Sequence, residues 1–230
     1  GMLYVSNMDD GLIYAVTDTG AISYSFTFDH GMDGRPMENK SVIQDDPDVP
    51  LTQFGRRVWG LNYNEAENRL YYAVWNATSW SDPVNENDIW SVEINPSTGD
   101  FVPMTAKREI TIVQPAIKKL PVSDIAFECG TRMLISERQA LLNNNSSASG
   151  VGETIGALDA RVLEFTGATS ANAGIGWSAS PDDKYDIGNY LNGTNAAGGV
   201  DFDEDGNVVA SGDALHNIPN QDRIYGFAII

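Results

Sequence analysis

The stretch "GGVDFDEDGNVVASGDA" at residues 198–214 combines two features that point to different structures. Asp201, Asp203 and Asp205 alternate before a glycine, as they do at the start of a calcium-binding loop. The same letters describe two short strands joined by an Asp-Gly turn, because glycine tolerates a positive φ. A calcium loop also requires a bidentate glutamate at its twelfth position, where this chain has Gly212. We therefore interpret the stretch as a hairpin first, and keep Ca2+ open as an opportunistic ligand of the three aspartates.

The hairpin pattern recurs twice, in "VWGLNYNEAENRLYYAVWN" (58–76) and in "VSDIAFECGTRMLISERQ" (122–139). Aligning the three stretches brings apolar residues into common columns on both sides of a polar turn, followed by a column of small residues. The columns are Leu61, Ile125 and Val200; Tyr63, Phe127 and Phe202; Leu70, Met133 and Val208; and Ala73, Ser136 and Ser211. Apolar residues that alternate with polar ones over short segments rich in Val, Ile, Tyr and Phe are typical of strands.

Further strands are expected after each hairpin. The third strands are predicted at "IWSV" (89–92), "VLEF" (162–165) and "IYGF" (224–227), and an N-terminal copy without its first strand begins at "LYVSN" (3–7). The fourth strands are predicted in "AISYSFTF" (21–28), "FVPMTAKREITI" (101–112) and "KYDIGNYL" (184–191). Repeated four-stranded antiparallel units are the signature of a β-propeller.

We therefore expect an all-β fold, a small β-propeller of about four repeated antiparallel sheets, with five blades left open. Residues 1–230 are predicted to form a single propeller domain that closes within the chain. The blade-like repeats cover approximately residues 3–28, 58–112, 122–191 and 198–230. The opening Gly1-Met2 looks like the scar of a cleaved tag, so we expect the chain to be a piece of a longer protein.

Charge and composition narrow the classes of partner. The chain has 14 basic and 32 acidic residues and a net charge of −18, a field that repels nucleic acid. No run approaches the roughly 20 apolar residues of a membrane helix, so we expect no membrane insertion. Cys129 is the only cysteine, which excludes an internal disulfide, and His30 and His216 are a poor supply of zinc ligands. We expect a monomeric domain without a cofactor, Ca2+ apart.

Two groups of residues are candidate binding sites. Trp75, Asn76 and Trp80 lie in "WNATSWSDP" (75–83), which combines indoles with Asn, Thr and Ser and so suits stacking on a sugar ring; Trp177 is a further indole near a strand end. The alternative for this segment is a loop folded over the propeller rim.

Asp124 is a candidate for a different reason. It stands at the start of a predicted innermost strand, in the column of Gly60 and Gly199, which would face the central channel of a propeller. Two interpretations remain open: a ligand for a metal ion in the channel, or an acceptor for neighbouring backbone N–H groups.

Several stretches resemble known families. The hairpin "VDFDEDGNVVAS" (200–211) is similar to those of the NHL and SMP-30/gluconolactonase propellers, and the SMP-30 group among them holds a metal in the channel with Glu, Asn and Asp. The glycines aligned with Asp124 depart from that ligand set. More of the chain, including "FGRRVWGL", "IWSVEINPSTGDF", "RMLISER" and "GTNAAGGVDFD", resembles propeller-like domains near the N-termini of large bacterial cell-surface proteins. This resemblance implies a secreted or cell-surface location and a role in adhesion or binding.

The leading hypothesis is a non-catalytic extracellular module that binds a glycan or protein partner through loops on one propeller face. The alternative is a metal-dependent hydrolase or lactonase with its site in the central channel. The binding module needs exposed aromatic residues on loops, whereas the enzyme needs several carboxylates or amides that meet at the axis. Asp124 is the residue on which the enzyme hypothesis depends most.

Overall fold

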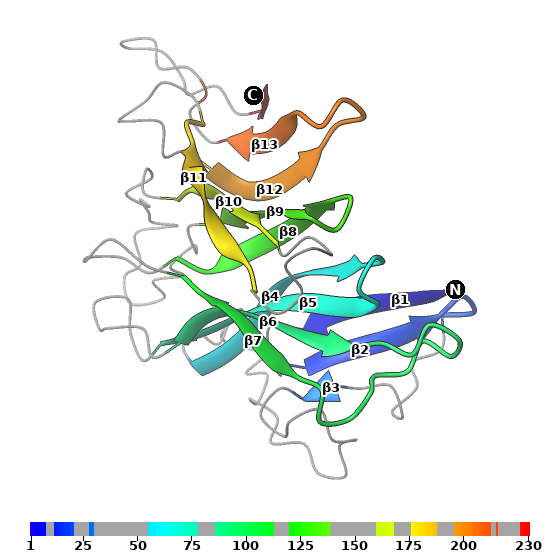
Figure 1. The fold of residues 1–230 in the computed structure, drawn as a ribbon. Coiled ribbons are helices and arrows are strands. Elements are labelled where there is room, and N and C mark those ends of the chain that lie inside the picture. The colour runs from blue at the N-terminus through cyan, green and yellow to red at the C-terminus, as the bar shows by residue number, and fades with distance from the viewer. Residues whose placement is uncertain are drawn as a thin grey trace. The chain divides into compact units, whose positions relative to one another are not determined.

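The fold is all-β and fits a small β-propeller: the strands form four antiparallel sheets, and none of the described residues is in a helix (Figure 1). The computed structural model describes residues 1–7, 12–20, 28–29, 55–77, 86–112, 120–138, 160–167, 176–187, 196–212, 215 and 226–230. Among these residues, no helix of a length and hydropathy suited to spanning a membrane is found.

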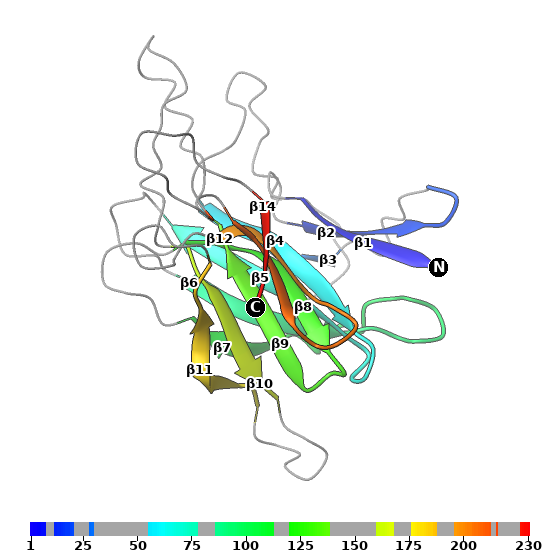
Figure 2. The ribbon, with the colours of Figure 1, turned by 90° about the horizontal axis from the view of Figure 1, so that it is seen from above.

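Each sheet is made of strands that follow one another along the chain. Sheet 1 contains β1 (Met2–Asn7), β2 (Leu12–Thr17) and β3 (Phe28–Asp29), and sheet 2 contains β4 (Gly55–Asn64), β5 (Arg69–Ala77), β6 (Glu86–Glu93) and β7 (Lys107–Thr111). Sheet 3 contains β8 (Val122–Glu128), β9 (Arg132–Glu137), β10 (Val162–Thr166) and β11 (Ser178–Tyr185), and sheet 4 contains β12 (Ala196–Phe202), β13 (Val208–Gly212) and β14 (Gly226–Ile229). Figure 2 shows β11, β10, β9 and β8 side by side in that order.

The strand register confirms the predicted hairpin repeat. The pairs Tyr63↔Leu70, Phe127↔Met133 and Phe202↔Val208 are equivalent, and so are the pairs formed by Leu61, Ile125 and Val200 with the second strands. In the N-terminal copy, Ser6 pairs with Ile13 as Ala73 pairs with Ile89, which places Ser6 in the column of small residues. The three stretches that the sequence aligned are therefore the same structural unit.

The column of small residues, Ala73, Ser136 and Ser211, lies opposite a shift in strand register that β4, β8 and β12 share. The register shifts between Val58 and Leu61 in β4, between Val122 and Asp124 in β8, and between Ala196 and Val200 in β12. A β-bulge bends its strand and leaves the extra residue outside the ladder. In sheet 4, for example, the Ser211 hydroxyl accepts a hydrogen bond from the Gly199 amide at 2.8 Å. A small residue is required at this position because the bulged backbone comes close to it.

Three later strands differ from their predicted positions. In sheet 4, Phe227 pairs with Ser211 and so takes the place that the sequence alignment gave to Ile224, three residues earlier. In sheet 3, β11 covers Ser178–Tyr185 and overlaps the predicted segment 184–191 only at its start. Strand β7 begins at Lys107, because Phe101 instead forms an isolated bridge with Ile94. Of the predicted strand 21–28, residues 21–27 lie outside the described residues.

The chain divides into two compact units, Gly1–Val113 and Gln114–Ile230, each built from two sheets. The core of unit 1, between sheets 1 and 2, consists of Ile13, Val58, Leu70, Tyr72, Val74, Val92 and Ile94. The core of unit 2, between sheets 3 and 4, consists of Leu120, Ala126, Leu134, Ala160, Val162, Ile187, Ala196, Val200, Val208 and Ala210. Most of these core residues alternate along a strand and so lie on one face of their sheet, whereas Ile94, Leu120, Ala160 and Ile187 lie outside the strands.

Candidate functional site

The two ends of each sheet carry connections of different kinds. At the turn end, the first strand joins the second through residues 65–68, 129–131 or 203–207. At the loop end, the second strand joins the third through residues 8–11, 78–85, 138–161 or 213–225. The connections at the turn ends are short and alike, whereas those at the loop ends differ widely in length. Constant strands with variable connections at one end are the usual arrangement of a binding surface.

A buried ion pair fixes the base of the longest loop-end connection. The Glu137 side chain is 0% exposed, and its carboxylate accepts hydrogen bonds from Arg161 Nη2 at 2.7 Å, Nε at 2.9 Å and the Arg161 amide at 3.1 Å. The Glu137 amide donates in turn to the Arg161 carbonyl at 2.9 Å. These two residues are where the chain leaves β9 and enters β10. We call this pair the clamp, because it holds the two ends of the connection together.

The loop end of sheet 2 is where two of the predicted binding residues lie. Trp75 is buried, so its indole packs inside the protein and presents no ring face to a sugar at the surface. Asn76 pairs with Glu86 in the ladder between β5 and β6. Asp88, on the returning strand, is also buried and lies 3.6 Å from Arg108 Nη1. Trp80 lies outside the described residues, in the connection that begins two residues after Asn76.

The remaining indole, Trp177, lies at the turn end of sheet 3. Its ring centroid is 5.9 Å from that of Phe127, and a Cβ atom on Gly167 would collide with the indole. Trp177 is therefore packed against the sheet's own turn. The structure thus places Trp75 at the loop end of sheet 2 and Trp177 at the turn end of sheet 3.

Of the three aspartates of the opening hairpin, Asp203 organises its turn. Asp203 Oδ1 accepts hydrogen bonds from the amides of Asp205 at 2.9 Å and Asn207 at 2.8 Å, and Oδ2 accepts one from the Asn207 side chain at 2.8 Å. The Asn207 side chain and these amides lower the pKa of Asp203. Asp201 Oδ1 accepts from the amide of Phe202 at 2.9 Å. In the described part of the chain, no group of three or more His, Cys, Asp or Glu side chains is arranged to hold a metal.

Asp124 joins the bulges of sheets 3 and 4. Its Oδ1 accepts from the Ile125 amide at 3.0 Å and its Oδ2 from the Val200 amide of β12 at 2.9 Å. Beside it, the Ser123 hydroxyl donates to the Gly198 carbonyl at 2.8 Å. Burial raises the pKa of Asp124, and the hydrogen bonds from the two amides oppose that shift. In this arrangement, both carboxylate oxygens accept from backbone amides, Oδ1 within β8 and Oδ2 across to β12.

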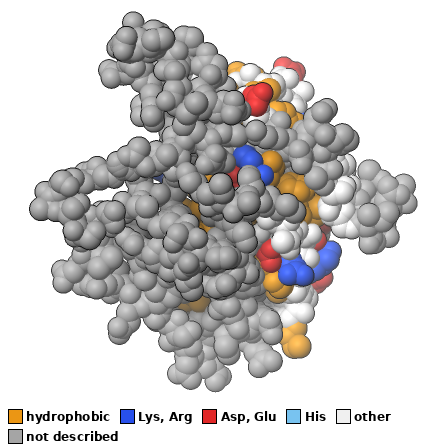
Figure 3. Space-filling model, turned by 90° about the vertical axis from the view of Figure 1, so that its left-hand side faces the viewer, with side chains coloured by type: hydrophobic (Ala, Val, Ile, Leu, Met, Phe, Trp, Pro, Cys, Tyr) orange, Lys and Arg blue, Asp and Glu red, His pale blue; other side chains and the backbone are white. Residues whose placement is uncertain are grey.

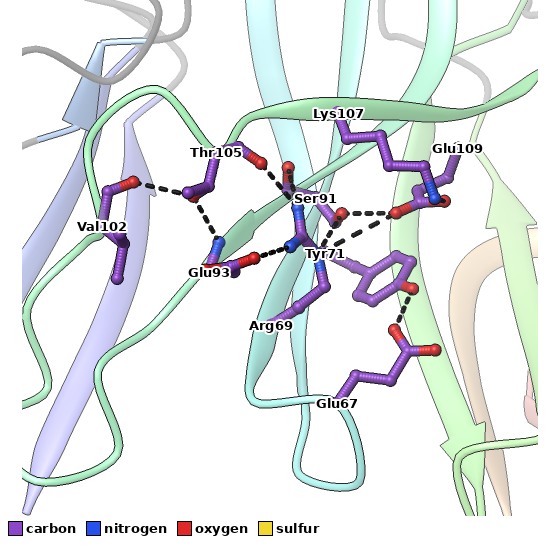
Figure 4. Close-up of polar contacts among 9 residues, drawn as sticks. All are labelled: Glu67, Arg69, Tyr71, Ser91, Glu93, Val102, Thr105, Lys107 and Glu109. Carbon is purple, nitrogen blue, oxygen red and sulfur yellow. Dashed lines mark hydrogen bonds and ion pairs between the residues drawn. The ribbon is translucent and has the colours of Figure 1, made fainter. Parts of the chain in front are cut away.

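Sequence reasoning missed an arginine cluster in sheet 2, shown in Figure 4. Arg69 Nε donates to the Ser91 hydroxyl at 2.8 Å, and Nη1 lies 3.0 Å from Glu93 Oε1. The Ser91 hydroxyl donates to Glu109 Oε1 at 2.6 Å, and Lys107 Nζ lies 2.9 Å from Glu109 Oε2. The cluster therefore ties β5, β6 and β7 together across one face of the sheet.

A second arginine stands at the equivalent position in sheet 3. Arg132 Nε and Nη2 donate to the two carboxylate oxygens of Glu164, at 2.8 and 3.2 Å, and Nη1 pairs with Glu128. Its guanidinium also lies 4.8 Å from the centroid of the Phe202 ring, which belongs to sheet 4. Hydrogen bonds from Arg132 lower the pKa of Glu164, which also accepts a bond from the Tyr185 hydroxyl.

One signal in the sequence could have revealed both arginines. They stand directly before Leu70 and Met133, which share a column of the repeat, so an arginine recurs at one repeat position. Other basic side chains in the described part of the protein also lie next to acidic ones. On the surface drawn in Figure 3, the blue basic groups lie beside red acidic ones.

The comparisons with known proteins give a limited result. No protein-family model matches the chain, and no curated protein matches it. Among solved structures, the chain is similar to the PQQ-bound form of an aldose sugar dehydrogenase from Streptomyces coelicolor, with 15% sequence identity and a TM-score of 0.44. The similarity covers 100% of this chain and 57% of that one, so the chain spans little more than half the length of the protein it matches.

Proposed function

We propose that the chain is a non-catalytic module, secreted or displayed at the cell surface, that binds a glycan through the connections at the loop ends of its sheets. The observation that carries the proposal is the clamp. A variable segment gains affinity when its base is rigid, because less freedom is lost on binding. The buried, multiply hydrogen-bonded pair of Glu137 and Arg161 supplies such a base for the connection 138–161.

A glycan is favoured over other partners for two reasons. The connection after β5 contains Trp80 among Thr78, Ser79 and Ser81, a composition suited to stacking on and hydrogen bonding to a sugar. A net charge of −18 disfavours acidic partners but leaves neutral sugars unaffected. Asp124, which the alternative hydrolase hypothesis needs, has both carboxylate oxygens engaged by backbone amides. We therefore favour the binding module over the hydrolase.

The test is binding of the purified chain to an array of neutral oligosaccharides, followed by calorimetric titration with the best binder. Trp80→Ala should raise its Kd by about tenfold or more, since aromatic anchors dominate binding energy. The matched control is Trp177→Ala, which removes the same side chain at a turn end and should leave Kd unchanged.

A second variant separates the glycan from a protein partner. Replacing residues 140–158 by a short Gly-Ser segment keeps the clamp and should keep the melting temperature. If the chain bound no sugar on the array but captured a protein that this variant released, the partner would be a protein and the glycan proposal would be wrong.

A further inference from the structure

Arg138 differs from the other basic side chains that the structure describes. Those side chains pair with carboxylates: Arg69 with Glu93, Lys107 with Glu109, Arg108 with Asp88, Arg132 with Glu164 and Arg161 with Glu137. Arg138 is exposed, and none of the described acidic side chains pairs with it, although the chain has 32 acidic and only 14 basic residues. Its guanidinium therefore keeps its N–H donors available to a ligand.

The backbone of Arg138 is fixed at the loop end of sheet 3. Arg138 is the first residue after β9, and its amide donates to the Pro121 carbonyl at 2.9 Å, which continues the pairing of β8 with β9. The preceding residue, Glu137, gives its carboxylate to Arg161 in the clamp. Because successive side chains of an extended chain point to opposite faces, Arg138 and Glu137 lie on different faces of the sheet.

The aliphatic stem of Arg138 lies against the backbone of sheet 4, in the same unit. A Cβ atom on Gly198 would be 2.9 Å from Arg138 Cβ and 3.0 Å from its Cδ, so the stem and the glycine are in close contact. The Gly198 carbonyl is held in turn by the Ser123 hydroxyl at 2.8 Å. An arginine often packs its methylene groups on a surface while its charged head stays in water. Because this stem is already held, less freedom is lost when the head binds a ligand.

The chemistry of the guanidinium selects the group that it binds best. Its donors form a planar fork without any acceptor, and a carboxylate matches that fork with two parallel, charge-assisted hydrogen bonds. The same protein shows this geometry at Arg132, where Nε and Nη2 donate to the two oxygens of Glu164 at 2.8 and 3.2 Å. At Arg138, the carboxylate has to come from a ligand.

We propose that Arg138 binds the carboxylate of one acidic sugar, a uronic or sialic acid, within the glycan that the loop ends recognise. This role rests on the proposed function and adds to it the chemical class of one sugar. Arg138 is the first residue of the connection 138–161, whose base the clamp makes rigid. The carboxylate would therefore be bound beside the connection that carries the proposed site.

The acidic character of the chain is compatible with one such carboxylate. A net charge of −18 disfavours ligands that carry many acidic groups. At physiological ionic strength, exposed charges more than about 8 Å apart are largely screened, so a single carboxylate responds mainly to the groups that it touches. A phosphate would bring a charge of about −1.5 to −2 instead. One acidic sugar in an otherwise neutral glycan fits both the free guanidinium and the acidic chain.

The test uses pairs of oligosaccharides that differ in one group: the C6 alcohol of the terminal sugar in the neutral member is a carboxylate in the acidic member. Calorimetric titration of the purified chain measures both Kd values. The acidic member should bind about fivefold more tightly, since an exposed ion pair contributes less than a buried one. This preference should shrink as the salt concentration rises.

Variants of Arg138 assign the preference to its guanidinium. Arg138→Gln keeps the first methylene groups against Gly198 and should give the two members the same Kd. Arg138→Lys keeps the charge but not the fork and should keep only part of the preference. Arg108→Gln is the matched control: it also removes one positive charge from an exposed arginine, but Arg108 already lies 3.6 Å from Asp88, so the preference should stay fivefold. Melting curves confirm that the variants are folded.

The possible failures are distinguishable. Equal Kd values in the unmodified chain, or an Arg138→Gln variant that keeps the preference, overturn the role of Arg138 and leave the proposed function standing. A chain that binds no sugar of either kind overturns the proposed function and this role with it. If a short peptide with a single glutamate displaced the acidic oligosaccharide at the same concentration, Arg138 would bind carboxylates in general, and its assignment to an acidic sugar would be wrong.

Discussion

The two units join their pairs of sheets by different chemistry. In unit 1, sheet 1 is joined to sheet 2 by neutral groups: the hydroxyls of Tyr4 and Ser6 donate to backbone carbonyls, and the rings of Tyr4 and Phe101 meet edge to face at 5.5 Å. In unit 2, a neutral bond from the Ser123 hydroxyl to the Gly198 carbonyl is supplemented by charged groups that join sheet 3 to sheet 4. Asp124 accepts from the Val200 amide, and Arg132 reaches the Phe202 ring. We call these contacts the neutral joint and the charged joint.

The two arginines make the same difference visible at a single repeat position. All the partners of Arg69 described above belong to sheet 2, whereas Arg132 has partners in sheet 3 and in sheet 4. One side chain type therefore locks a sheet internally in unit 1 and links two sheets in unit 2. The repeats share one backbone register, but the side chains that contact the next sheet differ from copy to copy. The contribution of each sheet-to-sheet contact to stability can therefore differ as well.

Replacing the arginines should produce the largest effects and should sharpen this contrast. Arg132→Met leaves the Glu164 carboxylate, whose side chain is 8% exposed, without its bidentate partner, and should lower the free energy of unfolding by about 3 kcal/mol. Arg69→Met should cost only about 1–2 kcal/mol, because Glu109 keeps Lys107 and Ser91. Urea unfolding of both variants gives the comparison. Equal losses would show that contacts between sheets 3 and 4 add nothing to the role of Arg132.

A substitution at Gly206, in the turn of sheet 4, tests the charged joint from the side of sheet 4. Its φ of 80° is unfavourable for a β-branched residue, and a Cβ atom there would collide with the Glu128 carboxylate, which pairs with Arg132. Gly206→Val should therefore lower the free energy of unfolding by about 2–3 kcal/mol. The neighbouring change Asp205→Ala should cost less than about 0.5 kcal/mol, because Asp203 rather than Asp205 supplies the side-chain acceptor of the turn. Thermal melting measures both, and a Gly206→Val variant as stable as Asp205→Ala would contradict the prediction.

The sequence predicted the strands well where side chains alternate. The columns that end in Val200, Phe202 and Val208 have the predicted register, because a one-residue slip would move every apolar side chain to the wrong face. The prediction was wrong for the last third strand, where "IYGF" and the following "FAII" both offer an apolar, variable, apolar spacing. Pairing with Ser211 decides between them, and pairing is not local.

The polar sites were less predictable than the strands. Asp203 organises the turn, and its side chain accepting the amide two residues later is a local pattern that the letters "DEDGN" already contain. The contacts of Asp124 and Arg132 cross from one sheet to the next, and no spacing along the chain encodes a partner such as Val200 or Phe202. Sequence reasoning therefore included the local bond of Asp124 to the Ile125 amide among its two interpretations, but it did not find the contacts that cross to the next sheet.

Small changes at the neutral joint should cost less than those at the charged one. Tyr4→Phe removes the hydrogen bond to the Gly99 carbonyl but keeps the ring contact with Phe101, and should lower the free energy of unfolding by about 1 kcal/mol. The matched change in unit 2 is Tyr185→Phe, which removes one of the two groups that hold Glu164. Urea unfolding should show a larger loss for Tyr185→Phe than for Tyr4→Phe. A loss for Tyr4→Phe that exceeds the one for Arg132→Met would invert the comparison.

The pH dependence of the free energy of unfolding should also differ between the two joints, and this is the smallest effect that we predict. Burial raises the pKa of Asp124, so its contribution to stability is complete below its ordinary pKa and is lost as the pH rises through the raised value. Arg132 lowers the pKa of Glu164, so the contribution of Glu164 is complete above its ordinary pKa and is lost as the pH falls through the lowered value. The neutral joint has no such response in acid, since burial raises the pKa of Tyr4 to about 12.

Carboxyl-carbon NMR titration measures these shifts directly. Asp124 should titrate above the ordinary value of about 3.9 and Glu164 below about 4.3. In the Arg132→Met variant, the pKa of Glu164 should rise because the guanidinium that favours its charged form is gone, while that of Asp124 should change little because its amide partners remain. If Glu164 titrated at its ordinary value in the unmodified chain, Arg132 would not hold it as described, and the distinction between a charged and a neutral joint would rest on Asp124 alone.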